Sequence, residues 1–402
     1  MNEDAPMAEV TDYSPYSEAA FDDPYPSYKV LRDTDPAHYS EEHNAHFLTR
    51  FDDIWALGTN AKNLSVQQGT TPDHLLLQNA GRSLSISNMD PPRHGRHRTV
   101  IGTRFRPNAA AEIEPTLRAF AAAKADELVE QGRGDLLRDY AAQIAVRGAL
   151  LTAGLPIELA ERATEWVNGI FHREPGHRGM TRLGKQAGIE IFEFCTDYIR
   201  DMRQRPDEAT GVLRTLLTEE IDGQPIADPV LASILSEILV GGSDTLPKGL
   251  GATLRRLWES PDLRRQVVAD PSLIPDAFLE ALRIDTPTQM LGRHCIREFE
   301  LHGKTIAPGS AVMFCWAAAN RDDREFENPD AYQITRRPKR MLAFGHGLHM
   351  CIGHHIAKAE AKLALEELLK RAPNYELHLD QAVRLRTEFV QGWVELPATL
   401  AA

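Results

Sequence analysis

Cys351 has the most informative surroundings of any residue that could do chemistry in this sequence. It lies in the segment Phe-Gly-His-Gly-Leu-His-Met-Cys-Ile-Gly at positions 344–353. The three glycines permit a tight turn and let the backbone approach a flat ligand closely. An amphipathic helix is predicted over 356–369, so the cysteine should stand at a helix N-terminus, where the dipole and free N–H groups stabilise a thiolate. None of the four cysteines forms a C-x-x-C pair, so a four-Cys zinc site is not indicated, and the thiolate suits the single axial position of a haem iron.

This segment resembles the haem-ligand signature of the cytochrome P-450 family, the haem-thiolate monooxygenases. It matches the family pattern F-G-x-G-x-H-x-C-x-G without a departure. The resemblance implies that haem b is the cofactor and that Cys351 is its axial thiolate and the metal ligand. It also implies that Phe344 packs beside the sulfur, that Gly345 and Gly353 belong to the cofactor-binding loop, and that His349 binds a haem propionate.

A second motif, Asp-Pro-Pro-Arg-His-Gly-Arg-His-Arg at 90–98, resembles the bacterial family pattern D-P-P-x-H-x-x-x-R. His94 and Arg98 are four residues apart and would share one helical face, which suits binding of a carboxylate. By the resemblance, both side chains bind a haem propionate, and Phe105-Arg106-Pro107 follows as the F-x-P of the family. Arg293 matches the arginine that binds the other propionate.

The segment Gly241-Gly242-Ser243-Asp244-Thr245 resembles the motif A/G-G-x-D/E-T of the family's long central helix. Cleavage of an O–O bond needs two protons, while a thiolate supplies electron density through the iron. An alcohol beside a carboxylate can relay protons from water, so Thr245 and Asp244 are the expected catalytic pair. The small residues at 241 and 242 leave room over the porphyrin.

Pro247 lies two residues after this pair, inside the predicted helix. Proline has no N–H, so the carbonyl of Ser243 loses its donor and the ring presses on that turn. We therefore expect a kink or a widened turn across 243–247, with the freed carbonyl bonded to water or to Thr245.

Glu280-Ala281-Leu282-Arg283 matches the E-x-x-R pattern of the family. Residues three apart lie on one face of a helix, so Glu280 and Arg283 can pair. The resemblance implies a buried pair with a structural role. Its other partner is expected from the segment between the pair and Cys351, around 320–322 and 326–329.

The elements that position these residues are predicted to be mainly helical. Apolar residues recur at spacings of three and four over 113–130, and Asp228-Pro229 begins a helix that extends to about Trp258. Short strands are predicted over 47–50, 299–302 and 311–315. The fold class is therefore mainly α with small β-sheets. The resemblance implies a triangular cytochrome P-450 fold, with the haem between the long central helix and the cysteine-loop helix.

Composition limits the classes of protein that remain. The chain has 402 residues and a net charge of -13, which argues against a general nucleic-acid binder. No segment is long and apolar enough for a membrane span, and residues 1–15 have no apolar signal core, so a cytoplasmic location and no membrane association are expected. We expect a flexible N-terminal arm over 1–23, one haem domain over 24–402, and a monomer.

The substrate pocket is inferred by position in the family. It should draw on the loop from about Leu64 to Asn88, and His74, Arg82 or Gln289 could orient a polar group. The other expected pocket residues are mostly apolar, which indicates a small hydrophobic organic substrate: Leu235, Ile238, Leu239, Gly242, Thr288, Gln289, Met290, Leu291, Phe389, Val390 and Trp393.

The resemblance implies a monooxygenase that inserts one oxygen atom from O2 into this substrate. The length leaves no room for a reductase or ferredoxin domain, so electrons should come from NAD(P)H through a ferredoxin reductase and a ferredoxin. Two other classes stay open: a non-hydroxylating haem-thiolate enzyme (a peroxygenase, isomerase or coupling enzyme), and a haem-binding sensor or carrier. The presence of Asp244 and Thr245 argues against a non-hydroxylating enzyme. A non-haem helical protein is a third alternative.

Two basic segments interrupt the acidic chain, at 93–106 and 336–340. In the family both border the thiolate side of the haem. Apart from the haem ligands, the arginines expected to be free there are Arg96, Arg104, Arg106, Arg337 and Arg340. We expect these side chains to form a docking patch for an acidic ferredoxin that acts mainly on the encounter rate.

Overall fold

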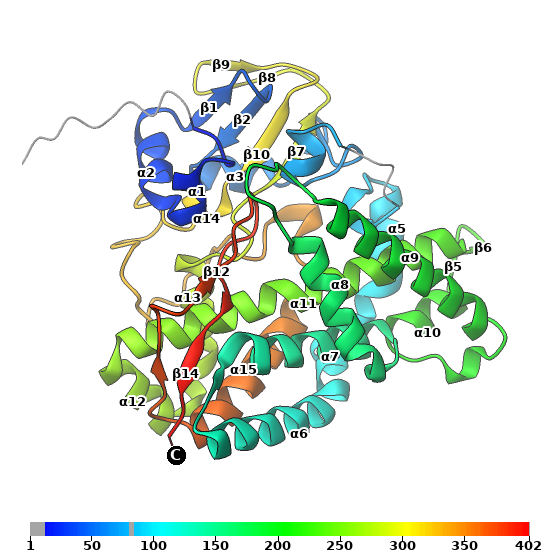
Figure 1. The fold of residues 1–402 in the computed structure, drawn as a ribbon. Helices are drawn as coiled ribbons and strands as arrows, with labels where there is room; N and C mark the ends of the chain where they lie inside the picture. The colour runs from blue at the N-terminus through cyan, green and yellow to red at the C-terminus, as the bar shows by residue number, and fades with distance from the viewer. Residues whose placement is uncertain (1–12, 80–83, 402) are drawn as a thin grey trace, which may run out of the picture.

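The computed structural model describes residues 13–79 and 84–401, in which a broad helical body lies beneath a smaller layer of strands (Figure 1). The predicted predominance of helix is confirmed. The α-helices in the described residues are α1 (Glu18–Asp22), α2 (Tyr25–Thr34), α3 (Phe51–Leu57), α4 (Pro72–Leu75), α5 (Arg93–Gly102), α6 (Pro107–Gln131), α7 (Ala142–Ala153), α8 (Ala160–Phe171), α9 (Arg182–Met202), α10 (Gly211–Thr218), α11 (Asp228–Glu259), α12 (Pro261–Ala269), α13 (Ile274–Ile284), α14 (Trp316–Ala319) and α15 (His354–Arg371).

The strands are short and form several small sheets. The largest sheet has the order β1-β2-β10-β7-β3, in which β2 and β10 pair in parallel and the other neighbours are antiparallel. The strands in the described residues are β1 (Ala37–Ser40), β2 (Ala45–Leu48), β3 (Leu64–Ser65), β4 (Arg133–Asp135), β5 (Glu220–Ile221), β6 (Gln224–Pro225), β7 (Leu291–Cys295), β8 (Phe299–Leu301), β9 (Lys304–Ile306), β10 (Ala311–Phe314), β11 (Glu376–Leu377), β12 (Val383–Arg384), β13 (Trp393–Glu395) and β14 (Pro397–Thr399). The three predicted strands are found as β2, β8 and β10.

The helix α11 crosses the helical body and organises it. It begins at Asp228 with Pro229 in its first turn, as predicted, and it packs against α7, α9 and α13. The helix α15 packs against α6 on the other side of the core. Contrary to the expectation from the sequence, one described helix, α11, is long and apolar enough to cross a membrane by length and composition alone; half of its most apolar window is buried inside the protein.

The described part of the expected N-terminal arm is folded. Ser17 caps α1 by accepting a hydrogen bond from the N–H of Ala20. Tyr13 is buried, its hydroxyl donates to that of Tyr28 at 3.3 Å, and its ring contacts Phe47. The Tyr13 side chain thus ties this polar stretch to the core, and the flexibility expected of it stays a prediction. Residues 1–12 lie outside the described residues.

Candidate functional site

Cys351 lies in a loop that closes on itself just before α15. Its N–H donates to the carbonyl of Phe344 at 2.8 Å. Gly345 and Gly347 have φ angles of 67° and 79°, in the left-handed region that glycine tolerates without strain. A Cβ at Gly347 would lie 2.2 Å from the carbonyl oxygen of Gly58, so only glycine fits there. The loop geometry thus explains two of the glycines of the motif.

The first turn of α15 faces the sulfur. Burial raises the pKa of the Cys351 thiol, and hydrogen bonds from the N–H groups of Gly353 and His354, together with the charge of Arg98, oppose that rise. The helix begins at His354, three residues after the cysteine, so the predicted relation between the cysteine and the helix N-terminus is correct to within one turn. These donors favour a thiolate, the form that binds a metal.

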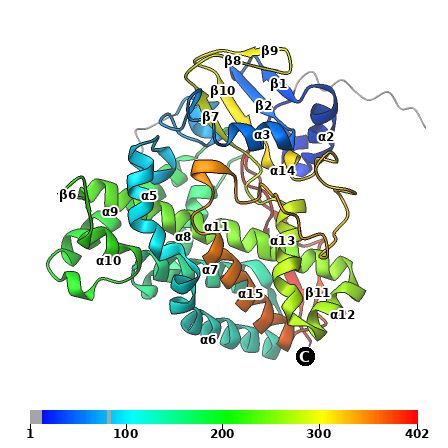
Figure 2. The same cartoon turned by 180° about the vertical axis from the view of Figure 1, so that it is seen from behind.

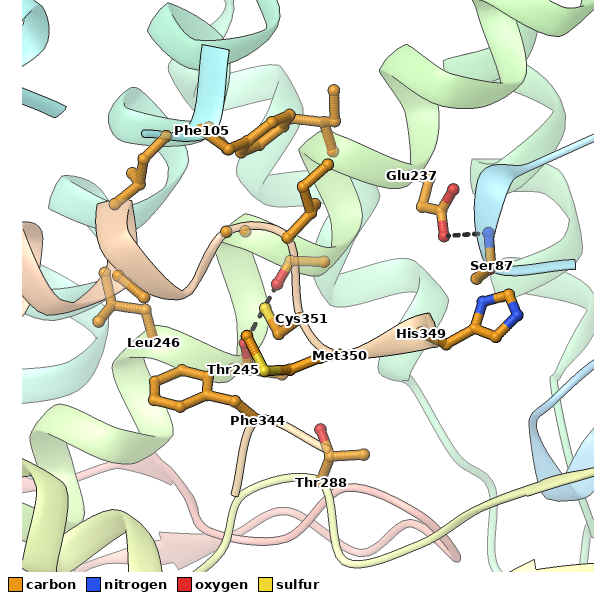
Figure 3. A pocket seen from close by; sticks show the side chains of 18 of the residues that line it. Ser87, Phe105, Glu237, Thr245, Leu246, Thr288, Phe344, His349, Met350 and Cys351 are labelled. Carbon is orange, nitrogen blue, oxygen red and sulfur yellow. Dashed lines mark hydrogen bonds between the residues drawn. The ribbon is translucent and has the colours of Figure 1, made fainter. Parts of the chain in front are cut away.

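Cys351 opens into a cavity of about 370 Å³ that lies between the cysteine loop and α11 (Figure 3). Most of the lining is apolar and comes from six parts of the chain that are far apart in sequence. Phe344 and Gly353 line it beside Cys351, and Thr245 faces the sulfur from α11. Seen from behind, the cysteine loop and the start of α15 lie beside α5 (Figure 2). The helix α11 and the cysteine loop therefore form two walls of one cavity.

Four basic side chains gather beside the cavity. His94, Arg98 and His349 line it, and the His94 and His349 rings have centroids 4.1 Å apart. Burial, then Arg293, His94 and Arg98, lower the pKa of His349 to about 3. Burial lowers the pKa of Arg293 to about 10, and its guanidinium lies over the ring of Phe314. The buried Nε2 of His94 has no hydrogen-bond partner among the described residues.

This donor set fits the carboxylates of a haem. Buried cations without a counter-charge are unfavourable, and a pair of propionates would supply both the negative charge and the missing partner of His94. The described residues contain no group of three or more His, Cys, Asp and Glu side chains that could hold a metal ion. A single thiolate in a flat apolar chamber is consistent with an iron carried by a porphyrin rather than held in a protein cage.

The predicted acid and alcohol are adjacent on α11 but face different surroundings. Thr245 lines the cavity, and its hydroxyl donates to the carbonyl of Gly241 at 3.1 Å. Asp244 is buried outside the cavity lining, where Oδ1 accepts a hydrogen bond from the ammonium group of Lys248. Its Oδ2 is buried with no hydrogen-bond partner in the described chain.

Residues 228–259 form one α-helix, so Pro247 does not interrupt α11. The expected widened turn across 243–247 is not observed, and the Thr245 hydroxyl bonds Gly241 rather than Ser243. Pro247 is buried in the core. Burial of its ring offsets the loss of one backbone hydrogen bond, and the helix continues.

Glu280 and Arg283 form a buried pair on α13, as predicted. Nε and Nη2 of Arg283 donate to the two oxygens of Glu280, each at 2.9 Å. Arg283 also donates to the carbonyl of Asn320 at 2.7 Å, which lies in one of the segments named above. Arg336, which the sequence reasoning assigned only to a basic surface, donates to Glu280 at 2.9 Å and completes the cluster.

Comparison with known proteins identifies the family. The family model described as Cytochrome P450 matches residues 177–397. A Mycobacterium tuberculosis protein named as a cytochrome P450 is 32% identical over 390 residues, which cover 96% of each chain. This chain belongs to the cytochrome P450 family. A protein of Pseudonocardia autotrophica named vitamin D(3) 25-hydroxylase is 30% identical over 392 residues, again 96% of each chain.

A solved structure supports the fold of this cytochrome P450. A protein from Bacillus megaterium, solved in complex with testosterone, superposes with a TM-score of 0.86 and 23% identity over 96% of this chain and 100% of that one. The predicted fold class is therefore confirmed. The chain is a cytochrome P450 monooxygenase, and members of this family bind haem b through a cysteine thiolate.

The predicted substrate-pocket residues of this cytochrome P450 divide into those that line the cavity and those that lie elsewhere. Ile238, Gly242, Thr288 and Leu291 line the cavity. The predicted residues that do not line it are Leu235, Leu239, Gln289, Met290, Phe389, Val390 and Trp393. His74 is likewise outside the lining, and Arg82 lies outside the described residues.

Helical periodicity explains this division on α11. The cavity side follows Ile234, Ile238, Gly242 and Leu246, each four residues after the one before, whereas Leu235 and Leu239 point into the core. After α13 the chain turns before β7, and there Pro287, Thr288 and Leu291 line the cavity whereas Met290 is buried in the core. Gln289 faces away, where it accepts a hydrogen bond from the hydroxyl of Tyr28 at 2.9 Å.

Sequence reasoning did not name Glu237 as a site residue, and it covered Ser87 only as part of the loop from Leu64 to Asn88. Glu237 and Ser87 both line the cavity, and Glu237 accepts hydrogen bonds from the loop that contains Ser87 (Figure 3). The spacing of Glu237, eight residues before Thr245, could have placed it on the cavity side, because eight residues are close to two full helical turns. Lys248, four residues after Asp244, could have been found by the same argument.

Proposed function

We propose that this cytochrome P450 hydroxylates a hydrophobic organic substrate. One atom of O2 enters a C–H bond of the substrate and the other leaves as water, while NAD(P)H supplies two electrons. The observation that carries this proposal is that the Cys351 sulfur and the Thr245 hydroxyl face one largely apolar cavity. The relative named as a hydroxylase supports the reaction class. When bound, the haem supplies oxygen activation and oxygen transfer.

The residues would hold the cofactor in distinct ways. Cys351 is proposed as the iron ligand, with Phe344, Gly345 and Gly353 shaping the loop around it. His94 and Arg98 on α5, Arg293 on β7 and His349 in the cysteine loop are proposed as the propionate partners. Two observations support that role. The buried Nε2 of His94 has no hydrogen-bond partner among the described residues, and burial together with nearby Arg293 and Arg98 lowers the pKa of His349. A propionate would supply the acceptor and the negative charge that these groups lack.

The proposed proton pathway uses two neighbouring residues of α11. Thr245 presents its hydroxyl to the cavity, and Asp244 collects protons on the side of the helix that faces away. Since the two side chains point in different directions, water must connect them. The ammonium group of Lys248 pairs with Asp244 and keeps the carboxylate in place, and Lys248 is therefore a positioning residue.

Electrons are proposed to come from a ferredoxin that a ferredoxin reductase reduces, in the cytoplasm. The structure reduces the size of the expected docking patch. Acidic partners lie within ion-pair distance of four of the five arginines: Arg96–Asp222, Arg104–Glu112, Arg337–Asp276 and Arg340–Glu325. Arg106 is exposed and makes no ion pair with a described residue. It follows η2 (Thr103–Phe105), which contacts α15, so it remains the best candidate for the docking contact.

The proposal is tested first by spectroscopy. The reduced protein with carbon monoxide should show a strongly red-shifted Soret band, which reports thiolate ligation. A library of apolar compounds should then contain ligands that shift the ferric spin state, and reconstitution with ferredoxin, its reductase and NAD(P)H should yield a hydroxylated product. Peroxide-driven or redox-neutral conversion without hydroxylation would favour a non-hydroxylating enzyme. Absence of any turnover with bound ligands would favour a sensor or carrier.

A further inference from the structure

A carboxylate side chain lines the part of the cavity that is proposed to hold the substrate. Glu237 is on α11, eight residues before Thr245, and lines the cavity together with it (Figure 3). Eight residues correspond to about 12 Å along a helix, so Glu237 lies two turns from the proposed site of oxidation. Its neighbours in the lining are mostly apolar, among them Ile86, Ile234 and Ile238.

Two backbone groups hold this carboxylate in place. The N–H of Ile86 donates to Oε2 at 2.9 Å, and the N–H of Ser87 donates to Oε1 at 3.2 Å. The Ser87 side chain also hydrogen-bonds this carboxylate. A carboxylate can accept about four hydrogen bonds, so these three contacts fix Glu237 on the cavity wall without using its full capacity.

Within residues 13–79 and 84–401, no basic side chain forms an ion pair with the carboxylate of Glu237. Arg98 is near enough to act on its charge, but its guanidinium donates to the carbonyl of Met350 and is proposed for a propionate. Burial raises the pKa of Glu237, and the hydrogen bonds from Ser87 and Ile86 and the charge of Arg98 oppose the rise.

Anchoring a loop does not require a charge. A neutral acceptor would bind the same N–H groups, whereas a buried carboxylate without a cation is costly. The cation is therefore best supplied by the ligand. We propose that Glu237 is a substrate-recognition residue that binds a protonated amine on an otherwise apolar substrate and so directs a carbon about two helical turns away towards Thr245. This inference rests on the proposed function and names the substrate class of the same cavity.

The charge also determines what the cavity rejects. An anionic group placed at Glu237 would face a like charge in a poorly solvated site, so fatty acids and other carboxylates with the same apolar body should bind weakly. A neutral alcohol can donate one hydrogen bond, so its affinity should lie between those of the ammonium and the carboxylate. The predicted order of affinity is ammonium, then alcohol, then carboxylate.

Three ligands with the same alkyl chain test this order: decylamine, decanol and decanoate. Their dissociation constants are measured on the ferric haem-loaded enzyme by calorimetry and by the shift in spin state. Decylamine should bind at least tenfold more tightly than decanol and should shift the iron towards high spin, because its nitrogen is held at Glu237. A low-spin, nitrogen-ligated spectrum would overturn the inference, since the amine would then have reached the iron.

Variants separate recognition from loop anchoring. Glu237→Gln should weaken decylamine binding at least tenfold and change decanol binding less than twofold, whereas Glu237→Asp should keep part of the preference for the amine. Glu360→Gln is the matched control, because Glu360 is the other buried acid that lines the cavity and comes from the cysteine-loop helix. It should leave the ratio of the two affinities unchanged. Equal loss for amine and alcohol in Glu237→Gln would reduce Glu237 to a loop anchor and overturn the inference.

The outcomes remain distinguishable from failure of the proposed function. A normal carbon monoxide band and hydroxylation of decanol, with no preference for the amine, would refute the role of Glu237 alone. Loss of the carbon monoxide band in the unmodified protein would refute the haem-thiolate proposal, whatever the calorimetry shows.

Discussion

The ammonium group of Lys248 pairs with the carboxylate of Asp244 one turn earlier on α11, and both side chains are buried. The C-terminal segment covers the pair closely. A Cβ at Gly392 would lie 2.6 Å from Cγ of Lys248, so glycine is needed at that position. The acid of the oxygen-activation motif is therefore tied to its own helix, on the side away from the cavity.

Replacement of Lys248 by Met should destabilise the protein, because it leaves the buried Asp244 carboxylate unpaired. Loss of one partner of a buried pair typically costs about 3–5 kcal/mol. The double variant Asp244→Asn with Lys248→Met should regain part of this loss, since no buried charge remains. Urea unfolding of the wild type, both single variants and the double variant gives the coupling energy. Strictly additive effects would show that the two charges do not interact.

Replacement of Thr245 by Ala should uncouple the enzyme, because the cavity loses the hydroxyl proposed to deliver protons. NAD(P)H would still be consumed, but peroxide should replace much of the product. Asp244→Asn should lower turnover more than it changes substrate affinity. The control is Thr253→Ala, since the Thr253 hydroxyl makes the same kind of bond, to the carbonyl of Gly249 at 2.8 Å, outside the cavity. Wild-type coupling in both Thr245→Ala and Asp244→Asn would exclude the proposed proton pathway.

Replacement of Cys351 by Ser should abolish hydroxylation, because the alcohol cannot supply the electron density of a thiolate. The haem can still bind through its propionate partners, so the visible spectrum separates loss of ligation from loss of cofactor. Cys195→Ala is a suitable control, as Cys195 lies on the buried face of α9 and does not line the cavity. Retained turnover in Cys351→Ser would contradict the assignment of the iron ligand.

Glu360 should make stability depend on pH. Burial raises its pKa well above the ordinary value, and Oε1 has no hydrogen-bond partner among the described residues. The folded chain then binds the proton more tightly than the unfolded chain, so stability is highest below the unfolded pKa and falls as pH rises towards the folded one. Within that window the loss is about 1.4 kcal/mol per pH unit. Glu360→Gln should flatten the dependence measured by urea unfolding between mildly acidic and neutral pH; an unchanged slope would contradict this.

Charge reversal at Arg106 should slow ferredoxin-driven reduction several-fold at low ionic strength and leave substrate affinity unchanged. The effect should shrink as salt screens the encounter. Arg104→Glu and Arg340→Glu should act in the same direction, but less, because acidic partners already lie beside those two side chains. Arg200→Glu on α9, whose partner Asp197 is also exposed, is the control. Equal reduction rates across a salt titration would exclude the patch.

The features that the sequence alone determined are those formed by residues close together along the chain. The loop at 344–353 brings its own glycines and its own cysteine, and the helix that follows supplies the N–H groups that face the sulfur. Glu280 and Arg283 pair because three residues return to the same face of a helix. Spacing and backbone preference are local quantities, so motifs of this kind predict their geometry as well as their presence.

Tertiary structure alone decided which apolar residues face the cavity and which charges find partners. Ile238 and Leu239 are equally apolar neighbours, yet only Ile238 lines the cavity, since the rotation of α11 is set by its packing against α7 and α9. Glu237 meets the loop at Ile86, and Arg336 meets Glu280, across long separations in sequence. Such contacts depend on how the whole chain packs around its core. The periodicity of one segment predicts its own secondary structure, but it does not predict which charged or apolar side chains of a distant segment will pack against it.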